Sequence, residues 1–179
     1  MLTAAAAICI LVAFFYITFF VVFPLGRGAV FFPSMRSHVE QMVALAAVGP
    51  GDRAVDLGSG DGRVVIALAR TGAEAHGFEI NPALVLLSRW NIQRAGFAGR
   101  AHVHWGNFWN ADLSVYRAVT IFQGGYIMKR LERKAMRELP PGARVVSDYW
   151  RFPTLKPFRA AGTLTVYKMG VKTDVADYA

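Results

Sequence analysis

The sequence contains only one cysteine, Cys9, among its 179 residues. A single thiol cannot form an internal disulfide, which excludes the class of small secreted domains held together by disulfides. Histidine is also scarce, and the spacing with cysteine or acidic residues that is typical of metal sites is missing. The histidines are His38, His76, His102 and His104. We therefore predict a protein of a reducing compartment that binds no metal ion.

A second absence concerns charge, because no Asp, Glu, Lys or Arg occurs within residues 2–23. At a rise of about 1.5 Å per residue, such a run is long enough to cross a hydrocarbon core of roughly 30 Å. No Lys or Arg precedes the run, as it would in a signal peptide. We therefore expect a retained transmembrane helix within residues 1–26. Arg27 and Arg36 follow, so the positive-inside rule predicts a single-pass membrane protein whose domain, residues 27–179, lies on the cytoplasmic side.

The rest of the chain carries all of the charge, a formal net +8 from 20 Lys and Arg against 12 Asp and Glu. A basic domain is attracted to anionic lipid headgroups, and nucleic acid is the competing partner. The most strongly charged stretch, KRLERKAMRE at 129–138, mixes both signs at helical spacing. We interpret it as a solvated helix face. The expected partner is therefore a lipid bilayer, reached through the N-terminal helix, and no nucleic acid.

Strand-like and helix-like segments alternate along the domain, which is typical of a parallel sheet covered on both faces. The expected strands are 53–57, 75–80, 101–105, 118–122 and 144–149, and the expected helices are 34–48, 62–70, 82–95 and 126–139. The last two strands, 155–161 and 163–169, are expected to form a hairpin. The predicted fold class is α/β: a Rossmann-like, doubly wound, mostly parallel sheet with a C-terminal antiparallel hairpin, preceded by one transmembrane helix.

The stretch DLGSGDGR follows the first expected strand. Its glycines permit positive φ angles and let a ligand approach the main chain. Doubly wound folds bind adenosine-type ligands at this position, the carboxyl ends of the strands. The spacing differs from the G-x-G-x-x-G dinucleotide fingerprint and lacks the G-K-[ST] ending of a phosphate loop. The predicted cofactor-binding residues of the loop are Asp56, Gly58, Ser59, Gly60 and Gly62.

Acidic residues near this loop favour a cationic ligand over a phosphate. Asp56 suits a positively charged amine, and Glu79, at the end of the second expected strand, is placed to accept hydrogen bonds from ribose hydroxyls. S-adenosylmethionine carries an amine, a sulfonium and a ribose, and no phosphate. After the third strand, Asn107 is placed to contact adenine. Phe108 or Trp109 can stack on the adenine, and core packing explains these rings equally well.

These residues resemble the class I, seven-strand methyltransferases that use S-adenosylmethionine. The chain is similar in particular to the small lysine methyltransferases of the mitochondrial ATP synthase c subunit and the adenine nucleotide carrier, and to their archaeal and bacterial relatives. The similar segments lie between Phe31 and about Met169 and include FFPS, DLGSGDGRVVIALA, GFEINPALVLLSR, VTIFQGGYIM and ELPPGARVVSDYWRFP. The resemblance implies cofactor roles for Asp56, for the loop glycines and for Glu79. The group usually has Asp where Asn107 stands, and IFQGGY also departs from its pattern.

Methyl transfer to lysine, which the resemblance implies, requires that the lysine first lose a proton, although its pKa is near 10.4 in water. A nearby sulfonium and an apolar channel both disfavour the ammonium form. Aromatic faces can hold an amine by cation–π attraction, and an amide oxygen can orient it. The catalytic candidates are Gln123, Tyr126 and Tyr149. Further candidates for the channel are Phe31, Phe32 and Trp150, with Asp148 as a proton acceptor or a structural residue.

The expected membrane tether limits the acceptors that such an enzyme can reach. Our first expectation is protein-lysine methylation of a membrane protein with a juxtamembrane lysine. Methylation of a lipid-soluble small molecule, such as a quinone or a lipid, is the alternative with the same cofactor site. A non-catalytic cofactor-binding module is a further alternative, which the intact set of loop glycines and Glu79 disfavours.

Overall fold

The computed structural model of the chain describes residues 2–16 and 36–170. The α-helices are α1 (Leu2–Tyr16), α2 (Arg36–Ala46), α3 (Arg63–Arg70), α4 (Pro82–Arg94) and α5 (Met128–Glu138). The strands are β1 (Arg53–Leu57), β2 (Glu74–Glu79), β3 (Ala101–Trp105), β4 (Ala118–Ile121), β5 (Arg144–Asp148), β6 (Arg159–Ala161) and β7 (Leu164–Lys168). Two short 3-10 helices also belong to the described part, η2 (Phe108–Asn110) and η3 (Gly125–Ile127).

Helix α1 is apolar but short. Its 15 residues cover roughly 22 Å at about 1.5 Å per residue, less than the roughly 30 Å of a hydrocarbon core. Among residues 2–16 and 36–170, no helix combines the length and the apolar character needed to cross a bilayer. The expected transmembrane helix is therefore wrong, and so is the expected single-pass membrane topology. The domain boundary expected at residue 26 lies outside the described residues.

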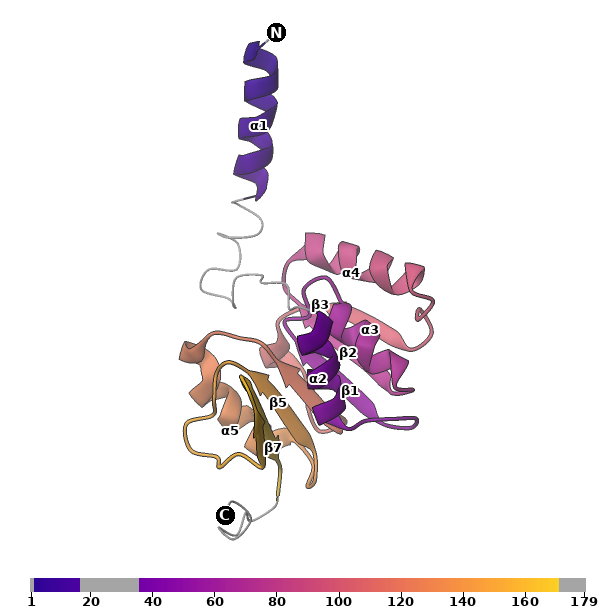
Figure 1. Cartoon of the computed structure of the whole chain (residues 1–179), viewed down its shortest axis with the longest axis vertical. Coiled ribbons are helices and arrows are strands. Elements are labelled where there is room, and N and C mark those ends of the chain that lie inside the picture. Colours follow the sequence, from indigo (N-terminus) through magenta and orange to yellow (C-terminus); the bar gives the residue numbers. More distant parts are fainter. Residues whose placement is uncertain (1, 17–35, 171–179) are drawn as a thin grey trace.

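The seven-stranded sheet has the order β3-β2-β1-β4-β5-β7-β6. Strands β1 to β5 pair in parallel, whereas β7 runs antiparallel to both β5 and β6. This arrangement confirms the Rossmann-like, mostly parallel sheet with its C-terminal hairpin (Figure 1). The chain moves outward from β1 through β2 to β3 and then returns to place β4 on the other side of β1. The sheet therefore has its switch point between β1 and β4, where doubly wound folds bind their ligands.

Apolar side chains lie on both faces of the sheet, as expected where helices and strands alternate along the chain. Ala54 of β1 packs with α2, α3 and α4 on one face. Val55 and Leu57 pack on the other face with α5 and with the segment 108–116 that follows β3. Figure 1 shows α5 well apart from α2, α3 and α4. The loops that follow β1 and β4 therefore lie at the edge of the sheet where the carboxyl ends of these strands meet.

Local signals explain most element boundaries. The side chain of Asn81 accepts a hydrogen bond from the Ala83 N–H at 3.0 Å, and Pro82 is the first helical residue, so α4 begins where its cap predicts. Strand β6 is shorter than expected. The stretch before it is held by α5, because the Glu132 carboxylate accepts the N–H groups of Thr154 at 2.9 Å and Leu155 at 2.6 Å.

Candidate active site

The glycine loop leaves β1 and passes over the end of β2. The N–H groups of Gly58 and Ser59 both donate to the carbonyl of Phe78, at 2.9 and 3.0 Å. The φ angles of Gly58, Gly60 and Gly62 are 85°, 53° and 81°, in the left-handed region that glycine enters at little cost. The loop therefore has the tight, main-chain-lined course that the sequence predicted.

Two of the glycines also have a packing role that the sequence did not indicate. A Cβ on Gly58 would overlap the amide of Gln123, and a Cβ on Gly62 would overlap the hydroxyl of Ser88 in α4. Gln123 and Ser88 are both buried. Close approach at these glycines thus involves protein side chains, because the loop is wedged between the end of β4 and helix α4.

Ser59 turns its side chain into the protein. It is buried, and a Cβ on Gly77 of β2 would lie 2.6 Å from the Ser59 hydroxyl. Within the described residues, this hydroxyl has no hydrogen-bond partner. Ser59 can therefore face a ligand on the outer side of the loop only through its main chain.

Asp56 lies directly under the loop and is buried. The hydroxyl of Thr120, its register partner on β4, donates to its Oδ1 at 2.6 Å. Burial raises the pKa of Asp56 to about 7, a change that the Thr120 hydrogen bond opposes and the nearby charge of Glu79 reinforces. A buried carboxyl that titrates near neutrality is typical of functional sites.

Glu79 is fixed against the same loop. Its Oε2 accepts the Gly60 N–H at 2.9 Å and its Oε1 accepts the Asn81 N–H at 2.8 Å. Burial raises the pKa of Glu79, and the backbone N–H groups at Asn81 and Gly60 counteract this rise. Glu79 therefore faces the loop, as the hypothesis of a ribose-binding carboxylate requires. The sequence did not indicate that the carboxylate also ties the loop to β2.

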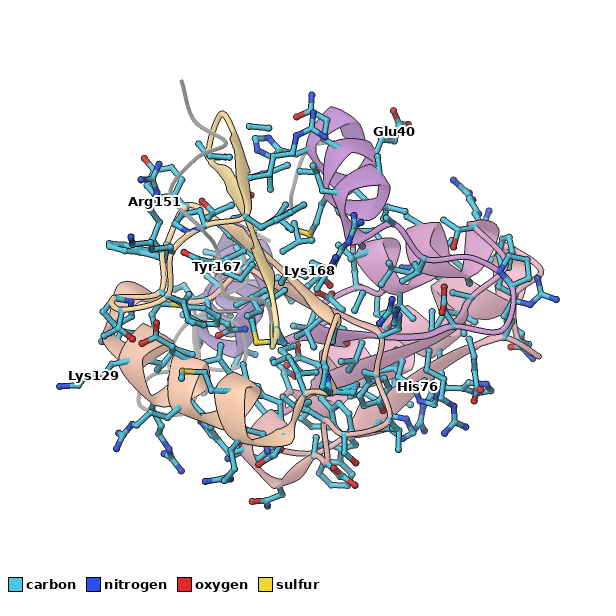
Figure 2. All side chains as sticks on the ribbon, turned by 90° about the horizontal axis from the view of Figure 1, so that it is seen from below. Glu40, His76, Lys129, Arg151, Tyr167 and Lys168 are labelled. Atoms are coloured by element: carbon cyan, nitrogen blue, oxygen red, sulfur yellow. The ribbon has the colours of Figure 1, made fainter. Side chains whose placement is uncertain are left out.

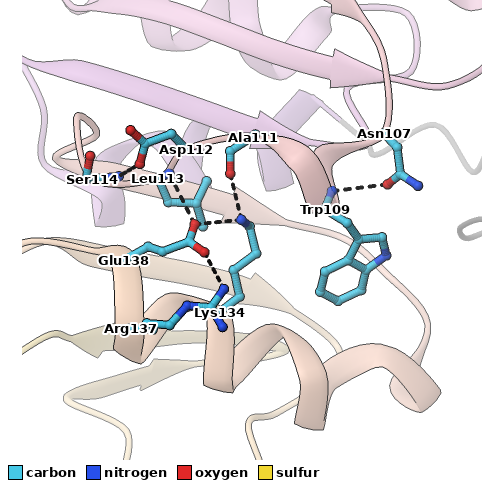
Figure 3. Close-up of polar contacts among 9 residues, drawn as sticks. All are labelled: Asn107, Trp109, Ala111, Asp112, Leu113, Ser114, Lys134, Arg137 and Glu138. Atoms are coloured by element: carbon cyan, nitrogen blue, oxygen red, sulfur yellow. Dashed lines mark hydrogen bonds and ion pairs between the residues drawn. The ribbon is translucent and has the colours of Figure 1, made fainter.

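Asn107 and Phe108 have local structural roles after β3. The amide oxygen of Asn107 accepts the Trp109 N–H at 3.1 Å and caps η2 (Figure 3). Phe108 is buried in the core on the α5 face, 4.9 Å from the Trp109 ring between centroids. The core-packing alternative thus describes Phe108. Trp109 stacks with an arginine of α5, since the guanidinium carbon of Arg130 lies 4.1 Å from its ring centroid.

Aromatic side chains gather where the loops after β4 and β5 meet. A Cβ on Gly125 would lie 2.5 Å from the Trp150 ring, so this ring rests on the main chain of η3. Tyr126 and Tyr149 are 71% and 69% exposed, and the ring centroids of Tyr149 and Trp150 lie 6.1 Å apart. Two catalytic candidates, Tyr126 and Tyr149, are therefore accessible from solvent. The channel candidates Phe31 and Phe32 lie outside the described residues.

Gln123, the third catalytic candidate, points elsewhere. Its Nε2 donates to the carbonyl of Leu57 at 2.8 Å, and the side chain is buried. The amide joins the end of β4 to the end of β1 across the switch point of the sheet. This position suits a residue that holds the glycine loop in place rather than one that contacts an acceptor.

Asp148 is held by two residues that the sequence analysis did not single out for this role. The Thr163 hydroxyl donates to its Oδ1 at 2.6 Å, and His38 Nε2 lies 2.9 Å from the same hydroxyl and 3.5 Å from Asp148 Oδ1. These contacts fix the carboxylate immediately before Tyr149. No local sequence pattern indicates these roles of Thr163 and Thr120, because each threonine contacts an aspartate from a distant segment of the chain.

A row of histidines lies on β2 and β3. His76 Nδ1 is 2.9 Å from His104 Nε2, and His76 Nε2 is 3.1 Å from a carboxylate oxygen of Glu74. Burial lowers the pKa of His76 and of His104. In the part of the chain that the structure describes, no group of three or more His, Cys, Asp or Glu is arranged to hold a metal ion.

The sequence around the site matches a known protein family. Residues 56–159, which include the loop, Glu79 and the aromatic residues, match the family model described as the ANTKMT methyltransferase domain. The chain belongs to this family. Over 146 residues it is 38% identical to the mouse lysine N-methyltransferase of the ATP synthase c subunit, a match that spans 79% of this chain and 59% of the mouse protein.

Other relatives carry similar names. The mouse adenine nucleotide translocase lysine N-methyltransferase is 40% identical over 70% of this chain and 55% of its own length. A protein-lysine N-methyltransferase of Saccharolobus islandicus is 38% identical over 64% of this chain and 73% of its own length. The chain thus spans less than two thirds of the mouse relatives that it matches.

Solved structures agree on the fold. The crystal structure of an RNA methyltransferase from Salinibacter ruber in complex with S-adenosyl-L-homocysteine has a TM-score of 0.73 and 34% identity, over 82% of this chain and 97% of that chain. A methyltransferase from Geobacter sulfurreducens, also in complex with S-adenosyl-L-homocysteine, has a TM-score of 0.56 and 23% identity, over 65% of this chain and 50% of that chain. The second likeness shows the fold alone.

Proposed function

We propose that this chain binds S-adenosylmethionine at the glycine loop and is a protein-lysine N-methyltransferase. One observation carries the proposal: Asp56 and Glu79 flank a glycine loop at the switch point of the sheet, in a chain of the ANTKMT methyltransferase domain family. The named targets of the mouse relatives are the c subunit of ATP synthase and adenine nucleotide translocase. We propose an acceptor of the same kind, a lysine in a membrane-associated protein.

The residues around the loop fit the chemical groups of S-adenosylmethionine. One oxygen of Asp56 is held by Thr120, and the carboxylate can still pair with the cofactor amine. Each oxygen of Glu79 accepts one backbone N–H, and an ionised carboxylate has about four acceptor positions, enough for ribose hydroxyls as well. We propose that the main chain at Gly58, Ser59 and Gly60 and the amide of Asn107 complete the site. Phe108 and Gly62 support it through packing.

Bound S-adenosylmethionine supplies an electrophilic methyl group on a sulfonium. The contribution of the chain is alignment, which can lower a barrier by about 7–11 kcal/mol in well-oriented systems. Tyr126, Tyr149 and Trp150 lie at the carboxyl ends of β4 and β5, where their rings can hold an amine by cation–π attraction. The positive charge of a nearby sulfonium disfavours the ammonium form and so promotes loss of the lysine proton. Gln123 holds the loop and does not need to touch the acceptor.

RNA is a second candidate acceptor. It is favoured by one observation, the likeness to the Salinibacter ruber RNA methyltransferase, whose chain is covered over 97% of its length at 34% identity. The net charge of +8 is compatible with an anionic acceptor of this kind. A lipid-soluble acceptor is a weaker alternative, because a rice sterol C-methyltransferase is 32% identical over only 33% of its own length.

A labelling experiment separates these acceptors. The purified full chain is incubated with methyl-labelled S-adenosylmethionine and a host extract, and the products are treated with protease, treated with ribonuclease, or extracted into organic solvent. We expect label that protease releases and that maps to lysine. Label that ribonuclease releases, or label only in the organic extract, would contradict the lysine proposal. Gly60→Arg in the loop should abolish cofactor binding, whereas Gly99→Arg, with open space around it, should not.

A further inference from the structure

Helix α5 presents a basic outer face. Lys129, Arg130, Arg133 and Arg137 are all exposed, and Figure 2 shows Lys129 pointing away from the protein. The acidic residues of the helix are already engaged. Glu132 is buried and accepts the backbone N–H groups of the segment before β6, whereas Glu138 accepts hydrogen bonds from Lys134 and Arg137. The carboxylates of the helix are therefore buried or paired, and positive charges dominate its solvent side.

This basic face contains a recess of about 270 Å³. We call this recess the basic hollow. It is lined by Trp109, Arg130, Arg133, Lys134 and Arg137. None of them is acidic. A concave site surrounded by several cations has a positive potential that favours a small anionic group over water and simple cations.

Two features hold the cations of the basic hollow in place. Arg130 is stacked on Trp109, with 4.1 Å between its guanidinium carbon and the ring centroid. Lys134 is buried, and its Nζ donates to the carbonyl of Ala111 and to Glu138 Oε2, both at 2.6 Å (Figure 3). An ammonium group has three donors, and these bonds use two of them. Ordering the cations in advance lowers the entropy cost of binding an anion.

The shape of the basic hollow selects among anionic partners. RNA bases stack on aromatic faces, and the face of the Trp109 ring that Arg130 covers is closed to such stacking. A bilayer surface is flat, whereas a recess of about 270 Å³ receives a protruding group such as a Glu or Asp side chain. Guanidinium groups pair with carboxylates through two parallel hydrogen bonds. Arg130, Arg133 and Arg137 extend over about 10 Å along the helix, so they match several acidic residues in succession.

Helix α5, which supplies most of the basic hollow, begins close to the proposed acceptor entrance. Helix α5 begins at Met128, two residues after the exposed Tyr126 at the carboxyl end of β4. A domain of net charge +8 repels a positively charged protein and attracts one whose lysine is surrounded by acidic residues. We propose that the basic hollow docks an acidic segment of the acceptor protein and so directs a lysine beside that segment to the active site. This inference rests on the proposed function and narrows its substrate class to lysines with acidic neighbours.

Peptides test the proposal with the full chain. Three peptides of equal length contain one lysine each, flanked by four Glu, by four Gln or by four Lys residues. A single-stranded RNA of matched charge and vesicles of anionic lipid serve as competing ligands. We expect the Glu peptide to bind at least about tenfold more tightly than the Gln peptide at low salt, and the difference to shrink as salt screens the charges.

The double variant Arg133→Glu/Arg137→Glu should weaken binding of the Glu peptide about tenfold and leave binding of S-adenosylmethionine unchanged. Arg70→Glu/Arg100→Glu is the matched control, because both arginines are exposed and the charge change is the same. The control should bind within about twofold of the parent chain. If the charge-reversed pair fails to fold, the neutral pair Arg133→Gln/Arg137→Gln replaces it, because it adds no repulsion within the helix. This neutral pair should weaken binding of the Glu peptide about threefold.

The outcomes distinguish this proposal from the proposed function. Equal binding of the Glu and Gln peptides overturns the docking proposal, even if both peptides are methylated. A loss of RNA or vesicle binding in the double variant, without a loss of peptide binding, also overturns it. Tight binding of the Glu peptide through Arg133 and Arg137 without methyl transfer to any lysine upholds the docking site and removes the lysine methyltransferase activity.

Discussion

The hydroxyl of Thr120 donates a hydrogen bond of 2.6 Å to the carboxyl of Asp56 on the adjacent strand, directly beneath the glycine loop. Burial nevertheless raises the pKa of Asp56 to about 7. The carboxyl therefore changes charge within the physiological pH range. If it pairs with the amine of S-adenosylmethionine, cofactor affinity depends on this single ionisation.

We expect the affinity for S-adenosylmethionine to increase with pH up to about 7, because only the ionised Asp56 attracts a cationic amine. Asp56→Asn should bind the cofactor at least about tenfold more weakly at high pH and show a flatter profile. Isothermal titration calorimetry between about pH 5 and about pH 9 provides the measurement. Glu40→Gln, which removes an exposed carboxylate, is the control, and an unchanged profile in Asp56→Asn would contradict the assignment.

The same carboxyl should make the stability of the ligand-free protein depend on pH. Below about pH 4, Asp56 is protonated in the folded and the unfolded state, since its ordinary value is 3.8. As the pH rises from about 4 to about 7, only the folded state retains the proton, so the free energy of unfolding decreases. Asp56→Asn should lose this part of the decrease and be the more stable protein at pH 8, as urea unfolding at several pH values would reveal. Equal slopes for both proteins would count against burial as the cause.

The glycine loop allows the cost of backbone strain to be separated from the cost of crowding. Gly58 and Gly51 have similar φ angles of 85° and 89°, but only a Cβ on Gly58 would meet another side chain, the amide of Gln123. Both substitutions by Ala should cost about 1 kcal/mol from the positive φ angle. Gly58→Ala should cost a further 1–3 kcal/mol, about the penalty of overpacking, and should weaken cofactor binding. Chemical denaturation and calorimetry measure the two effects, and equal effects at both positions would rule out the role of Gln123.

Because Gly125 and Trp150 are in close contact, we expect a substitution at Gly125 to reduce methyl transfer without changing cofactor affinity. A Cβ on Gly125 would lie 2.5 Å from the Trp150 ring, so Gly125→Ala should displace the ring from η3. We expect methyl transfer to fall about tenfold, since misplacing a positioning group reduces catalysis, while cofactor affinity stays unchanged. Gly99→Ala, with nothing within 4 Å, is the matched control. A parallel loss of cofactor affinity would show that Trp150 belongs to the cofactor site instead.

Sequence patterns predicted most of the sheet and the position of two carboxylates beside the glycine loop. The ranges expected for β1 and β3 agree with the structure, because short segments rich in strand-forming residues and bounded by turn residues give a strong local signal. The carboxyl groups of Asp56 and Glu79 lie at the loop because parallel strands bring their carboxyl ends to one edge. The prediction failed for the transmembrane helix. Apolar composition alone does not make a membrane span, and the helix that the structure describes here, Leu2–Tyr16, has 15 residues where roughly 20 are needed.

Other features of the site depend on contacts between distant segments, which no local pattern contains. Gln123 donates to the carbonyl of Leu57, 66 residues earlier in the chain, and its amide therefore supports the loop, a contact that its local sequence does not indicate. Ser88 crowds Gly62 only because α4 packs against the loop. The outward basic face of α5 is also hidden in the sequence, where Glu132 looks like one more surface charge although it is buried.

Tyr149 links strain in the backbone to the proposed acceptor site. Its φ angle of 68° is unusual for a residue other than glycine, and its N–H donates to the Thr163 carbonyl while the Trp150 N–H donates to the Asp148 carbonyl. A left-handed conformation costs an L-residue about 1–2 kcal/mol. The exposed ring of Tyr149 contributes little packing in return. Strain of this kind persists where function requires it.

Tyr149→Gly should therefore raise the free energy of unfolding by about 0.5 kcal/mol, because relief of strain exceeds the added entropy of the unfolded chain. Methyl transfer should fall about tenfold, since the ring that we propose to hold the amine is lost. Tyr149→Phe keeps both the ring and the strain. Its free energy of unfolding should therefore stay within about 0.5 kcal/mol of the parent chain, and its rate of methyl transfer within about twofold. Urea unfolding and initial rates measure the two quantities. A glycine variant that is both more stable and fully active would mean that the strained backbone at Tyr149 serves neither the acceptor nor the fold.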